Sequence, residues 1–199
     1  MKSDFLNKIN SSFKGRVTLN KKLANLSWFN VGGKASIFFK AEDLNDLLNF
    51  RRDMKKFNVN IKTIGAGSNL LIRDGGFKGT IIKLGKNFSN FSLKKDNMII
   101  AGTAALDKKL SQFALENSLA GFEFLSCIPG SVGGGIYMNS GCYDHDISQI
   151  LLSVQAVDLN GRLITIPRSE IKFHYRGSNL DSDLIFVSAT FQGTRKKKI

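Results

Sequence analysis

The sequence contains few residues of the types that bind metals or form disulfides. It has two cysteines and two histidines among 199 residues, and two cysteines cannot make a disulfide framework. Zinc usually takes three or four nitrogen or sulfur ligands, whereas His145 and His174 lie far apart in the chain. Cys127 and Cys142 have no obvious basic neighbour to activate a thiolate, so we interpret them as packing residues. We therefore expect no metal site and a reducing, cytoplasmic setting.

Long apolar runs are also missing. Lys2, Asp4 and Lys8 place charges near the N-terminus, where a secretory signal peptide needs an unbroken apolar stretch. No segment approaches the roughly 20 apolar residues of a membrane-spanning helix. The hydrophobic fraction of 42% and the charged fraction of 23% are typical of soluble globular proteins. We expect a cytoplasmic protein without a membrane partner, built as one domain or as two small lobes.

Acidic residues are scarce relative to basic ones. Lysine and arginine total 29 against 16 aspartates and glutamates, which gives a formal net charge of +13. Nucleic-acid binding is one interpretation of such a charge. The basic residues are scattered in pairs, such as Lys21–Lys22 and Arg51–Arg52, and this distribution is typical of solvated surfaces. We therefore expect no nucleic-acid partner, and we interpret the charge as a positive field that attracts anionic small molecules.

Short apolar segments predict a mixture of strands and helices. Helices are expected over residues 5–13, after Asp43 as a cap over 44–54, and after Asp107 as a cap, ending near Asn117. Strands are expected over residues 35–39, 60–64, 80–84, 97–101, 152–157, 162–166 and 183–188. Strand–helix–strand units come first and hairpins later, which predicts an α+β fold of two lobes divided near Gly85.

Glycine is the most informative residue type, and its 19 copies are clustered. Residues 65–70 (GAGSNL) follow a predicted strand, and residues 129–135 (PGSVGGG) form a second glycine-rich loop. Backbone N–H groups without flanking side chains can form a concave nest for phosphate, and two such loops suit the pyrophosphate of a dinucleotide. The alternative is that each loop is a tight turn without a ligand. The first loop lacks the third glycine of the Rossmann fingerprint, so a dinucleotide site would be of another type.

Arg176 is the candidate for recognising an anionic group. It stands in the segment FHYRGS over residues 173–178, and an arginine beside glycine and serine can present its planar fork to a carboxylate or a phosphate. The alternative is an ordinary surface arginine.

Five segments occur in an order that resembles a known family. They are residues 30–35 (NVGGKA), 65–71 with 74–79, 121–134 (GFEFLSCIPGSVGG), 137–143 (YMNSGCY) and 173–178. Together they resemble the UDP-N-acetylenolpyruvoylglucosamine reductase family, and the resemblance extends from about Leu19 to Gln192. It implies an FAD-binding domain of the vanillyl-alcohol-oxidase (PCMH) type over residues 30–194, with lobes of about 30–85 and 86–194. An N-terminal helix and lead-in would occupy residues 1–29, and a basic tail residues 195–199.

The resemblance also implies which residues hold FAD. One set would lie against the pyrophosphate: Gly65, Ala66, Gly67, Ser68, Asn69 and Leu70. A second set would line the other side of the cofactor: Ile128, Pro129, Gly130, Ser131, Gly133, Gly134, Tyr137, Asn139 and Gly141.

The activity implied by the resemblance is the NADPH-dependent, FAD-mediated reduction of UDP-N-acetylenolpyruvoylglucosamine to UDP-N-acetylmuramate in peptidoglycan precursor synthesis. Arg176 matches the family's catalytic arginine at the substrate carboxylate, and Tyr175 would bind substrate beside it. In the family a third, substrate-binding domain supplies a proton-donating serine and a glutamate; we expect that domain to be missing here and assign neither role. The alternatives are an FAD-binding fragment or relic without turnover, and another flavoprotein oxidase of the same fold.

Overall fold

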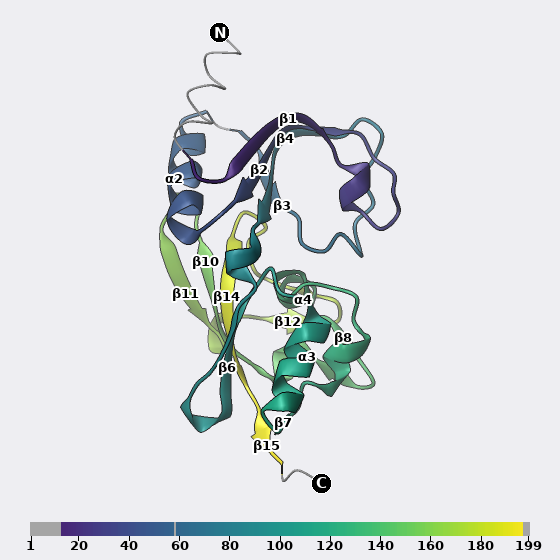
Figure 1. The fold of residues 1–199 in the computed structure, drawn as a ribbon, viewed down its shortest axis with the longest axis vertical. Coiled ribbons are helices and arrows are strands. Elements are labelled where there is room, and N and C mark those ends of the chain that lie inside the picture. Colours follow the sequence, from purple (N-terminus) through teal and green to yellow (C-terminus); the bar gives the residue numbers. More distant parts are fainter. Residues whose placement is uncertain (1–12, 58, 197–199) are drawn as a thin grey trace.

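The chain forms two lobes, each built on its own β-sheet (Figure 1). This computed structural model describes residues 13–57 and 59–196, so the helix expected over residues 5–13 lies outside it except for Phe13. The first sheet has the order β1-β2-β4-β3. Its strands are β1 (Arg16–Lys22), β2 (Lys34–Ala41), β3 (Ile61–Thr63) and β4 (Phe77–Leu84). β2 and β3 both run parallel to β4, and β1 pairs antiparallel with β2.

Helix α2 (Leu44–Lys55) covers the first sheet and begins where the sequence predicts. The Asp43 carboxylate accepts the backbone N–H of Asp46 at 2.9 Å, which confirms the predicted cap. Leu47, Phe50 and Met54 are buried on the helix face that meets the sheet. The ring of Phe50 stacks on Phe39 of β2, with 3.8 Å between the ring centroids. Amphipathic periodicity and a local cap therefore determine this element.

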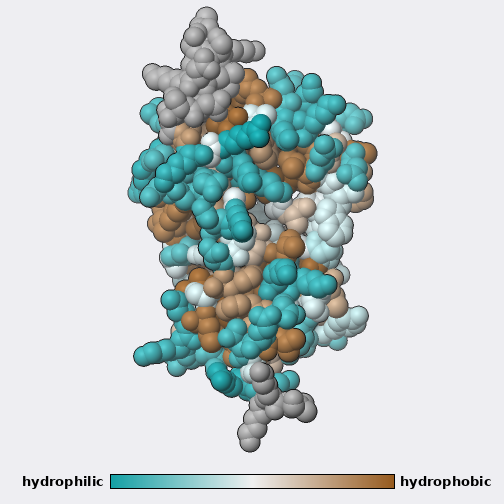
Figure 2. All heavy atoms as spheres, viewed as in Figure 1, coloured by the Kyte–Doolittle hydropathy of each residue, from teal (hydrophilic) through white to brown (hydrophobic). Residues whose placement is uncertain are grey.

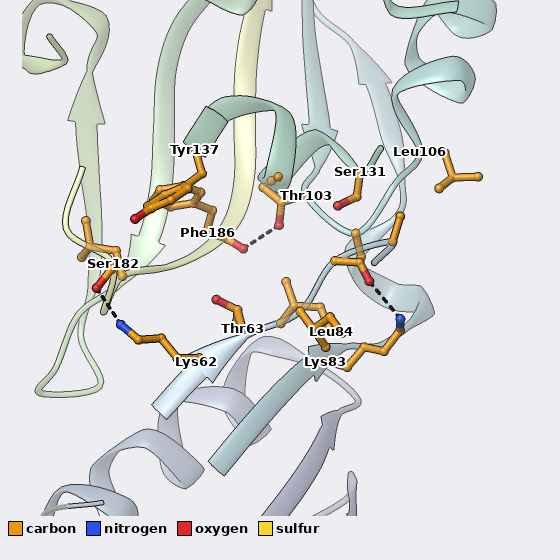
Figure 3. Close-up of a pocket in the computed structure, with 17 residues that line it drawn as sticks. Lys62, Thr63, Lys83, Leu84, Thr103, Leu106, Ser131, Tyr137, Ser182 and Phe186 are labelled. Carbon is orange, nitrogen blue, oxygen red and sulfur yellow. Dashed lines mark hydrogen bonds between the residues drawn. The ribbon is translucent and has the colours of Figure 1, made fainter. Parts of the chain in front are cut away.

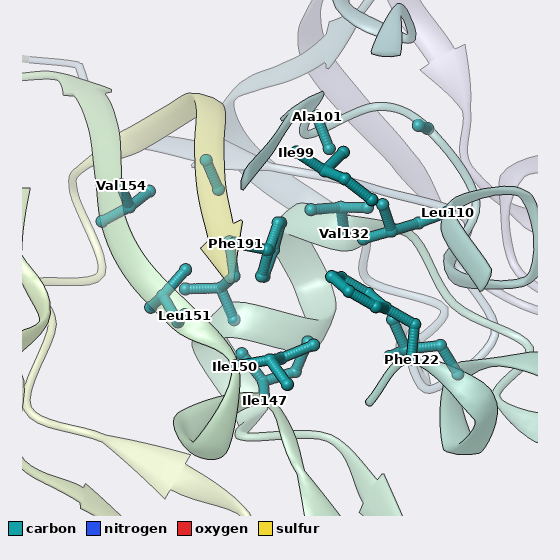
Figure 4. Close-up of a cluster of buried hydrophobic side chains, with 14 of the residues drawn as sticks. Ile99, Ala101, Leu110, Phe122, Val132, Ile147, Ile150, Leu151, Val154 and Phe191 are labelled. Atoms are coloured by element: carbon teal, nitrogen blue, oxygen red, sulfur yellow. The ribbon is translucent and has the colours of Figure 1, made fainter. Parts of the chain in front are cut away.

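The second lobe is an antiparallel sheet with helices on one face. The sheet has the order β11-β10-β14-β6-β5. Its strands are β5 (Phe91–Leu93), β6 (Met98–Gly102), β10 (Leu151–Val157), β11 (Leu163–Pro167) and β14 (Ile185–Gln192). Helices α3 (Asp107–Glu116) and α4 (Val132–Met138) pack against this sheet, and the buried side chains between them form the larger core (Figure 4). Phe122 and Phe191 meet edge to face at its centre, with centroids 6.3 Å apart.

Short elements complete the described residues. Two-residue strands are β7 (Leu119–Ala120), β8 (Gly141–Cys142), β9 (His145–Asp146), β12 (Phe173–His174), β13 (Gly177–Ser178) and β15 (Thr194–Arg195). Single 3₁₀ turns are η1 (Ala24–Leu26), η2 (Lys86–Phe88), η3 (Lys95–Asn97), η4 (Glu123–Cys127), η5 (Ile147–Gln149) and η6 (Arg168–Glu170). In the part of the chain that the structure describes, no helix has both the length and the apolar character to cross a bilayer.

The first sheet begins before the domain start that the sequence suggests. Residues 1–29 were expected to be a helix and lead-in, but β1 pairs with β2 from Arg16 opposite Lys40 to Lys22 opposite Lys34. Val17 on this strand is buried, whereas most of its neighbours are half-buried or exposed. An edge strand with so little apolar content gives a weak periodic signal, which explains why the sequence pattern does not reveal it.

Helix α4 occupies part of the segment that the sequence presents as a glycine loop. Three consecutive glycines, residues 133–135, have low helix propensity. Val132 and Ile136, however, are both fully buried in the larger core. The helix ends at Asn139, whose left-handed conformation (φ 44°) lets the N–H of Ser140 reach the carbonyl of Gly135 at 2.9 Å. Tertiary packing and this C-cap outweigh local propensity here.

Asp46 offers a direct test of what attaches the N-terminal segment to α2. Its buried carboxylate accepts the backbone N–H groups of Lys14, Gly15 and Glu42 at 3.0, 2.9 and 3.0 Å. Asp46→Ala leaves these three donors without that acceptor, so we expect the free energy of unfolding in urea to fall by about 2–4 kcal/mol. The control is Asp53→Ala on the same helix, whose carboxylate meets exposed Lys56; it should cost less than about 0.5 kcal/mol. Equal losses in both variants would contradict this role.

Candidate nucleotide site

A cavity of about 560 Å³ lies between the two lobes (Figure 3). Both lobes contribute to its wall, and both predicted glycine loops reach it. The first lobe supplies Lys62, Thr63, Ile64, Gly65, Ala66, Lys83 and Leu84. The second supplies Thr103, Ala104, Leu106, Ser131, Gly133, Gly134, Tyr137, Ser182, Leu184 and Phe186. A cleft of this size between lobes is a common location for a small-molecule site.

The first glycine loop leaves β3 at the edge of this cavity. The N–H of Ile64 still pairs with the carbonyl of Ile82 on β4 at 2.9 Å, and the chain then turns at Gly65 and Ala66. No described residue accepts a hydrogen bond from the backbone N–H groups of residues 65–69. Gly67 has φ +73°, and a Cβ there would overlap the carbonyl oxygen of Leu26. This loop therefore offers free amide donors in a turn that needs glycine, as a phosphate nest requires.

The second glycine loop differs in this respect. The N–H groups of Val132 and Gly133 donate to the carbonyls of Ala105 and Thr103, each at 2.9 Å. Those of Gly130 and Gly135 also donate to backbone carbonyls, at 2.9 and 2.8 Å. The sequence-based hypothesis that this loop forms a second phosphate nest is therefore wrong for these four donors. The loop instead presents a smooth wall of glycine backbone with Ser131 and Tyr137 toward the cavity.

The two loops approach each other closely across the cleft. A Cβ built on Gly65 would overlap the Oγ of Ser131, which belongs to the opposite lobe. Thr103, beside the second loop, donates through its Oγ1 to the carbonyl of Phe186 at 2.5 Å, and this buried bond fixes the loop against β14. A side chain at position 65 would therefore displace the Ser131 hydroxyl in the narrow part of the cleft.

The charges around the cavity are positive. Lys62 donates to the Oγ of Ser182 at 2.6 Å and lies 3.3 Å from the Asp183 carboxylate. Lys83 donates to the carbonyl of Gly65 at 2.9 Å. Burial, followed by the nearby charge of Lys40, lowers the pKa of Lys83 from its ordinary value. None of the described residues that line the cavity is acidic, so the cavity suits an anionic ligand.

A second cavity of about 420 Å³ adjoins the first. It is lined by Asn25, Leu26, Ser27, Trp28, Asn30, Ala66 and Lys83. Ala66 and Lys83 belong to both cavities. The backbone N–H of Trp28 donates to the carbonyl of Gly67 at 3.0 Å, and Ser27 Oγ donates to the carbonyl of Leu70 at 2.6 Å, so the segment around Trp28 is held against the first glycine loop.

Several predicted FAD-binding residues do not line the main cavity. Asn139 is buried. Its Nδ2 donates to the Asp146 carboxylate at 3.1 Å, and its Oδ1 accepts the backbone N–H of Ser148 at 3.0 Å. The others that do not line the main cavity are Gly67, Ser68, Asn69, Leu70, Ile128, Pro129, Gly130 and Gly141. The structure thus brings Gly65, Ala66, Ser131, Gly133, Gly134 and Tyr137 together at the main cavity and leaves the other predicted residues outside its lining.

Arg176 and Tyr175 lie outside the cavity, on the hairpin of β12 and β13. Arg176 donates to the carbonyls of Asn139 and Gly141 at 3.4 and 2.7 Å, and its guanidinium carbon lies 4.8 Å from the ring centroid of Tyr175. Tyr175 is 85% exposed. The Oγ of Ser178 on this hairpin donates to the carbonyl of Tyr137 at 3.1 Å. The hairpin is therefore attached to the helix that lines the cavity, with its arginine accessible to a ligand.

Sequence reasoning missed several residues of the wall. Lys83 had a visible signal, because it interrupts the apolar run of the strand Phe77–Leu84. Phe186 and Leu184 had none, since they resemble ordinary core residues of the strand Ile185–Gln192 and the residue before it.

Asp107 was expected to cap α3, and this expectation is wrong. The N-cap is Leu106, and Asp107 is the first residue of the helix. Its carboxylate is fully buried, and neither oxygen has a hydrogen-bond partner among the described residues. A Cβ at Gly135 would lie 3.2 Å from one of these oxygens, so the carboxyl group lies against the second glycine loop. Burial raises the pKa of Asp107 to about 7.

Comparison with known proteins identifies the class of domain. Residues 35–167 match the family model of the FAD binding domain, and the chain belongs to this family. The structure of a cholesterol oxidase from Brevibacterium sterolicum covers 92% of this chain and 38% of its own, with a TM-score of 0.67 and 13% identity, which is a likeness of fold alone. The predicted two-lobed α+β domain of the vanillyl-alcohol-oxidase type is confirmed.

More specific similarity points to one group of enzymes. The chain is 47% identical over 200 residues to UDP-N-acetylenolpyruvoylglucosamine reductase of Pelagibacter ubique (strain HTCC1062), covering 100% of this chain and 65% of that protein. The crystal structure of UDP-N-acetylenolpyruvylglucosamine reductase from Thermus caldophilus superimposes with a TM-score of 0.78 and 26% identity, covering 92% of this chain and 64% of that one. The resemblance inferred from the five segments is confirmed. The chain spans less than two thirds of the length of these relatives.

Asp107 predicts a specific dependence of stability on pH. The folded state holds its proton up to about pH 7, whereas the ordinary pKa of an aspartate is 3.8. The contribution of the protonated Asp107 is therefore fully present below about pH 4 and is lost as the pH rises through the raised pKa. Asp107→Asn cannot ionise, so its free energy of unfolding relative to the parent should increase by about 2–4 kcal/mol between about pH 4.5 and pH 8. Urea denaturation at several pH values measures this, with Asp53→Asn as the exposed control. A difference independent of pH would contradict the burial argument.

Proposed function

We propose that the cleft binds FAD and that the chain takes part in the NADPH-dependent reduction of UDP-N-acetylenolpyruvoylglucosamine to UDP-N-acetylmuramate. One observation carries this proposal: two glycine loops from opposite lobes converge on a cavity without carboxylates, in a chain that belongs to the FAD-binding-domain family. When bound, FAD supplies hydride transfer between the nicotinamide and the substrate double bond. The product of this reaction is a precursor of peptidoglycan.

The residues of the cleft fit the parts of FAD. The free amide donors of residues 65–69 suit a pyrophosphate, because they supply hydrogen bonds without a side chain in the way. The apolar side chains of Leu84, Leu106, Leu184 and Phe186 suit a flat ring system, which they would shield from water. Neither cysteine lines the cavity, so we propose non-covalent binding.

Arg176 is proposed to bind the carboxylate of the substrate. Reduction of the enolpyruvyl double bond places negative charge on the carbon beside this carboxylate, and a fixed guanidinium stabilises that charge. The carbonyls of Asn139 and Gly141 orient the guanidinium, and the exposed ring of Tyr175 supports it. We assign the proton donor to no residue of this chain.

A second candidate function is FAD binding without turnover. It is favoured by the position of Arg176, which lies on the hairpin of β12 and β13 and does not line the main cavity. Mixing the chain with the part of the Pelagibacter protein that lies beyond the match, and assaying the reaction, separates the two. Turnover that depends on the added part supports the first function, and FAD binding with no turnover in any mixture supports the second.

Titration with FAD tests the cofactor proposal. The parent protein should bind FAD, read by calorimetry and by quenching of flavin fluorescence. Gly67→Ala places a Cβ on the backbone carbonyl oxygen of Leu26 at a φ of +73°, so we expect the first glycine loop to shift and the affinity to fall by about tenfold or more. Gly75→Ala is the matched control, because a Cβ there meets no atom within 4 Å. Failure of the parent protein to bind FAD would overturn the proposal.

Arg176→Lys tests the proposed catalytic role in the chain mixed with the part of the Pelagibacter protein that lies beyond the match. Lysine keeps the charge and loses the planar fork, so product formation in a single turnover should slow by about 30- to 1,000-fold. The rate of the absorbance change on adding NADPH alone should change less than about threefold, because that step does not involve the substrate carboxylate. Arg168→Lys is the matched control, since Arg168 also lies 4.8 Å from an aromatic ring and donates to two carbonyls. Equal slowing of both steps would show that Arg176 is structural.

A further inference from the structure

The two cysteines of the chain are neighbours in the fold. Cys127 is the last residue of the turn η4 and is exposed. Cys142 lies on β8 and is half-buried, and its thiol donates to the carbonyl of Phe124 at 3.2 Å. Phe124 belongs to the same turn as Cys127. Two residues that stand on either side of α4 in the sequence therefore meet at one turn.

The two thiols also interact with each other. Burial is the main cause that raises the pKa of Cys142 above its ordinary value, and the charge of Cys127 and a side-chain hydrogen bond with it raise this pKa further. The charge of Arg176 acts in the opposite direction. Cys142 thus has a basic neighbour that the sequence does not reveal. Thiols joined by a hydrogen bond come from side chains that point toward one another, which is the arrangement that a disulfide needs.

The different exposure of the two residues sets an order of reaction. A thiolate is the form that attacks a disulfide, and the attack also requires access to the sulfur. Cys127 is open to a dissolved reagent, whereas Cys142 is half-buried and has a raised pKa. Once a reagent is attached to Cys127, the Cys142 thiol is already beside it. An attack within one molecule benefits from a high effective concentration.

We propose that Cys127 and Cys142 form a reversible disulfide when the chain meets a low-molecular-weight disulfide. The Cys127 thiol loses its proton to solvent, and its thiolate attacks one sulfur of the reagent. The S–S bond of the reagent breaks, and one half leaves as a thiolate that takes up a proton. The Cys142 thiol then loses its proton and attacks the Cys127 sulfur, which forms the internal disulfide and releases the second half. Two protein thiols are oxidised while one disulfide is reduced to two thiols, and an excess of the reduced thiol reverses both steps.

This disulfide would border the candidate site without lining its main cavity. Cys127 precedes the second glycine loop, and Cys142 follows Gly141, whose carbonyl accepts Arg176 at 2.7 Å. The new bond would close a loop of about 15 residues that contains the glycine loop and α4. The freedom of that segment would then depend on the ratio of thiol to disulfide in solution. The inference requires neither FAD nor turnover, so it stands or fails independently of the proposed function.

Incubation of the reduced parent protein with oxidised glutathione tests the proposal, with mass spectrometry after alkylation of the remaining thiols. The parent should lose the mass of two hydrogen atoms, retain no glutathione and take up no alkylating agent. Met138 is the single methionine between the cysteines, so cleavage there with cyanogen bromide should leave two fragments joined until dithiothreitol is added. A parent protein that stops at a glutathione adduct, joins two copies of the chain or keeps both thiols would overturn the proposal.

Two serine variants test the order of reaction. Cys142→Ser keeps a donor for the carbonyl of Phe124 and leaves the exposed thiol, so it should gain one glutathione and form no internal bond. Cys127→Ser leaves the half-buried thiol, which should gain glutathione at least about tenfold more slowly. Equal rates in the two variants would contradict the proposed first attack by Cys127. Thermal melting of the reduced variants shows whether each is folded, and the mass of the parent protein decides the existence of the disulfide even where a variant is not.

Discussion

The cleft depends on a fixed relation between the two sheets, and a buried arginine establishes it. Arg51 extends from α2 in the first lobe and donates to the carbonyls of Asp158 and Asp183 in the second, at 3.3 and 3.0 Å. Its side chain is almost fully buried, so these bonds replace water that the guanidinium has lost. Around it, one apolar cluster joins both lobes, with Phe39 and Phe50 from the first and Val157, Ile185 and Val187 from the second. With one side of the lobe interface fixed in this way, the other side is left as a cavity.

The asymmetry of the two glycine loops follows from where their backbone groups are used. The second loop passes the end of β6, and the carbonyls of Thr103 and Ala105 take its amide donors as α4 begins. The first loop follows a three-residue strand at the edge of its sheet, and the described residues leave its donors free. Two segments of similar composition therefore have different chemistry. The second loop forms part of the cavity wall, whereas the first loop has backbone N–H groups free to donate hydrogen bonds. Composition alone does not distinguish the two loops, because the carbonyl groups that accept the N–H groups of the second loop belong to residues distant from it in sequence.

The sequence predicted those elements that are determined by residues within the element itself, such as a helix cap or a periodic apolar face. The cap and apolar face of α2 and four strands of the second sheet, β6, β10, β11 and β14, have such causes and occur within a few residues of the expected positions; β5 was not expected. The elements that the sequence did not reveal depend on distant partners. β1 needs β2 to bury Val17, and α4 needs the large core to offset its three glycines. Asp107 was a plausible cap by spacing, but the segment around Gly130 packs over it and buries its carboxyl group.

The same distinction applies to charge. The formal net charge of +13 suggested an attraction for anions in general. Most of the described basic residues are exposed, however, and hydrophilic residues cover much of the face drawn in Figure 2. Such surface charges are screened within about 10 Å at ordinary ionic strength. Among the described residues that line the main cavity, the charged ones are Lys62 and Lys83, and pairing with Asp183 offsets the charge of Lys62. The uncompensated charge is then at Lys83, against a neutral carbonyl and in a region of reduced solvation. The positive charge of the cavity wall thus depends on one position and its pairing, and a sum over the sequence cannot locate it.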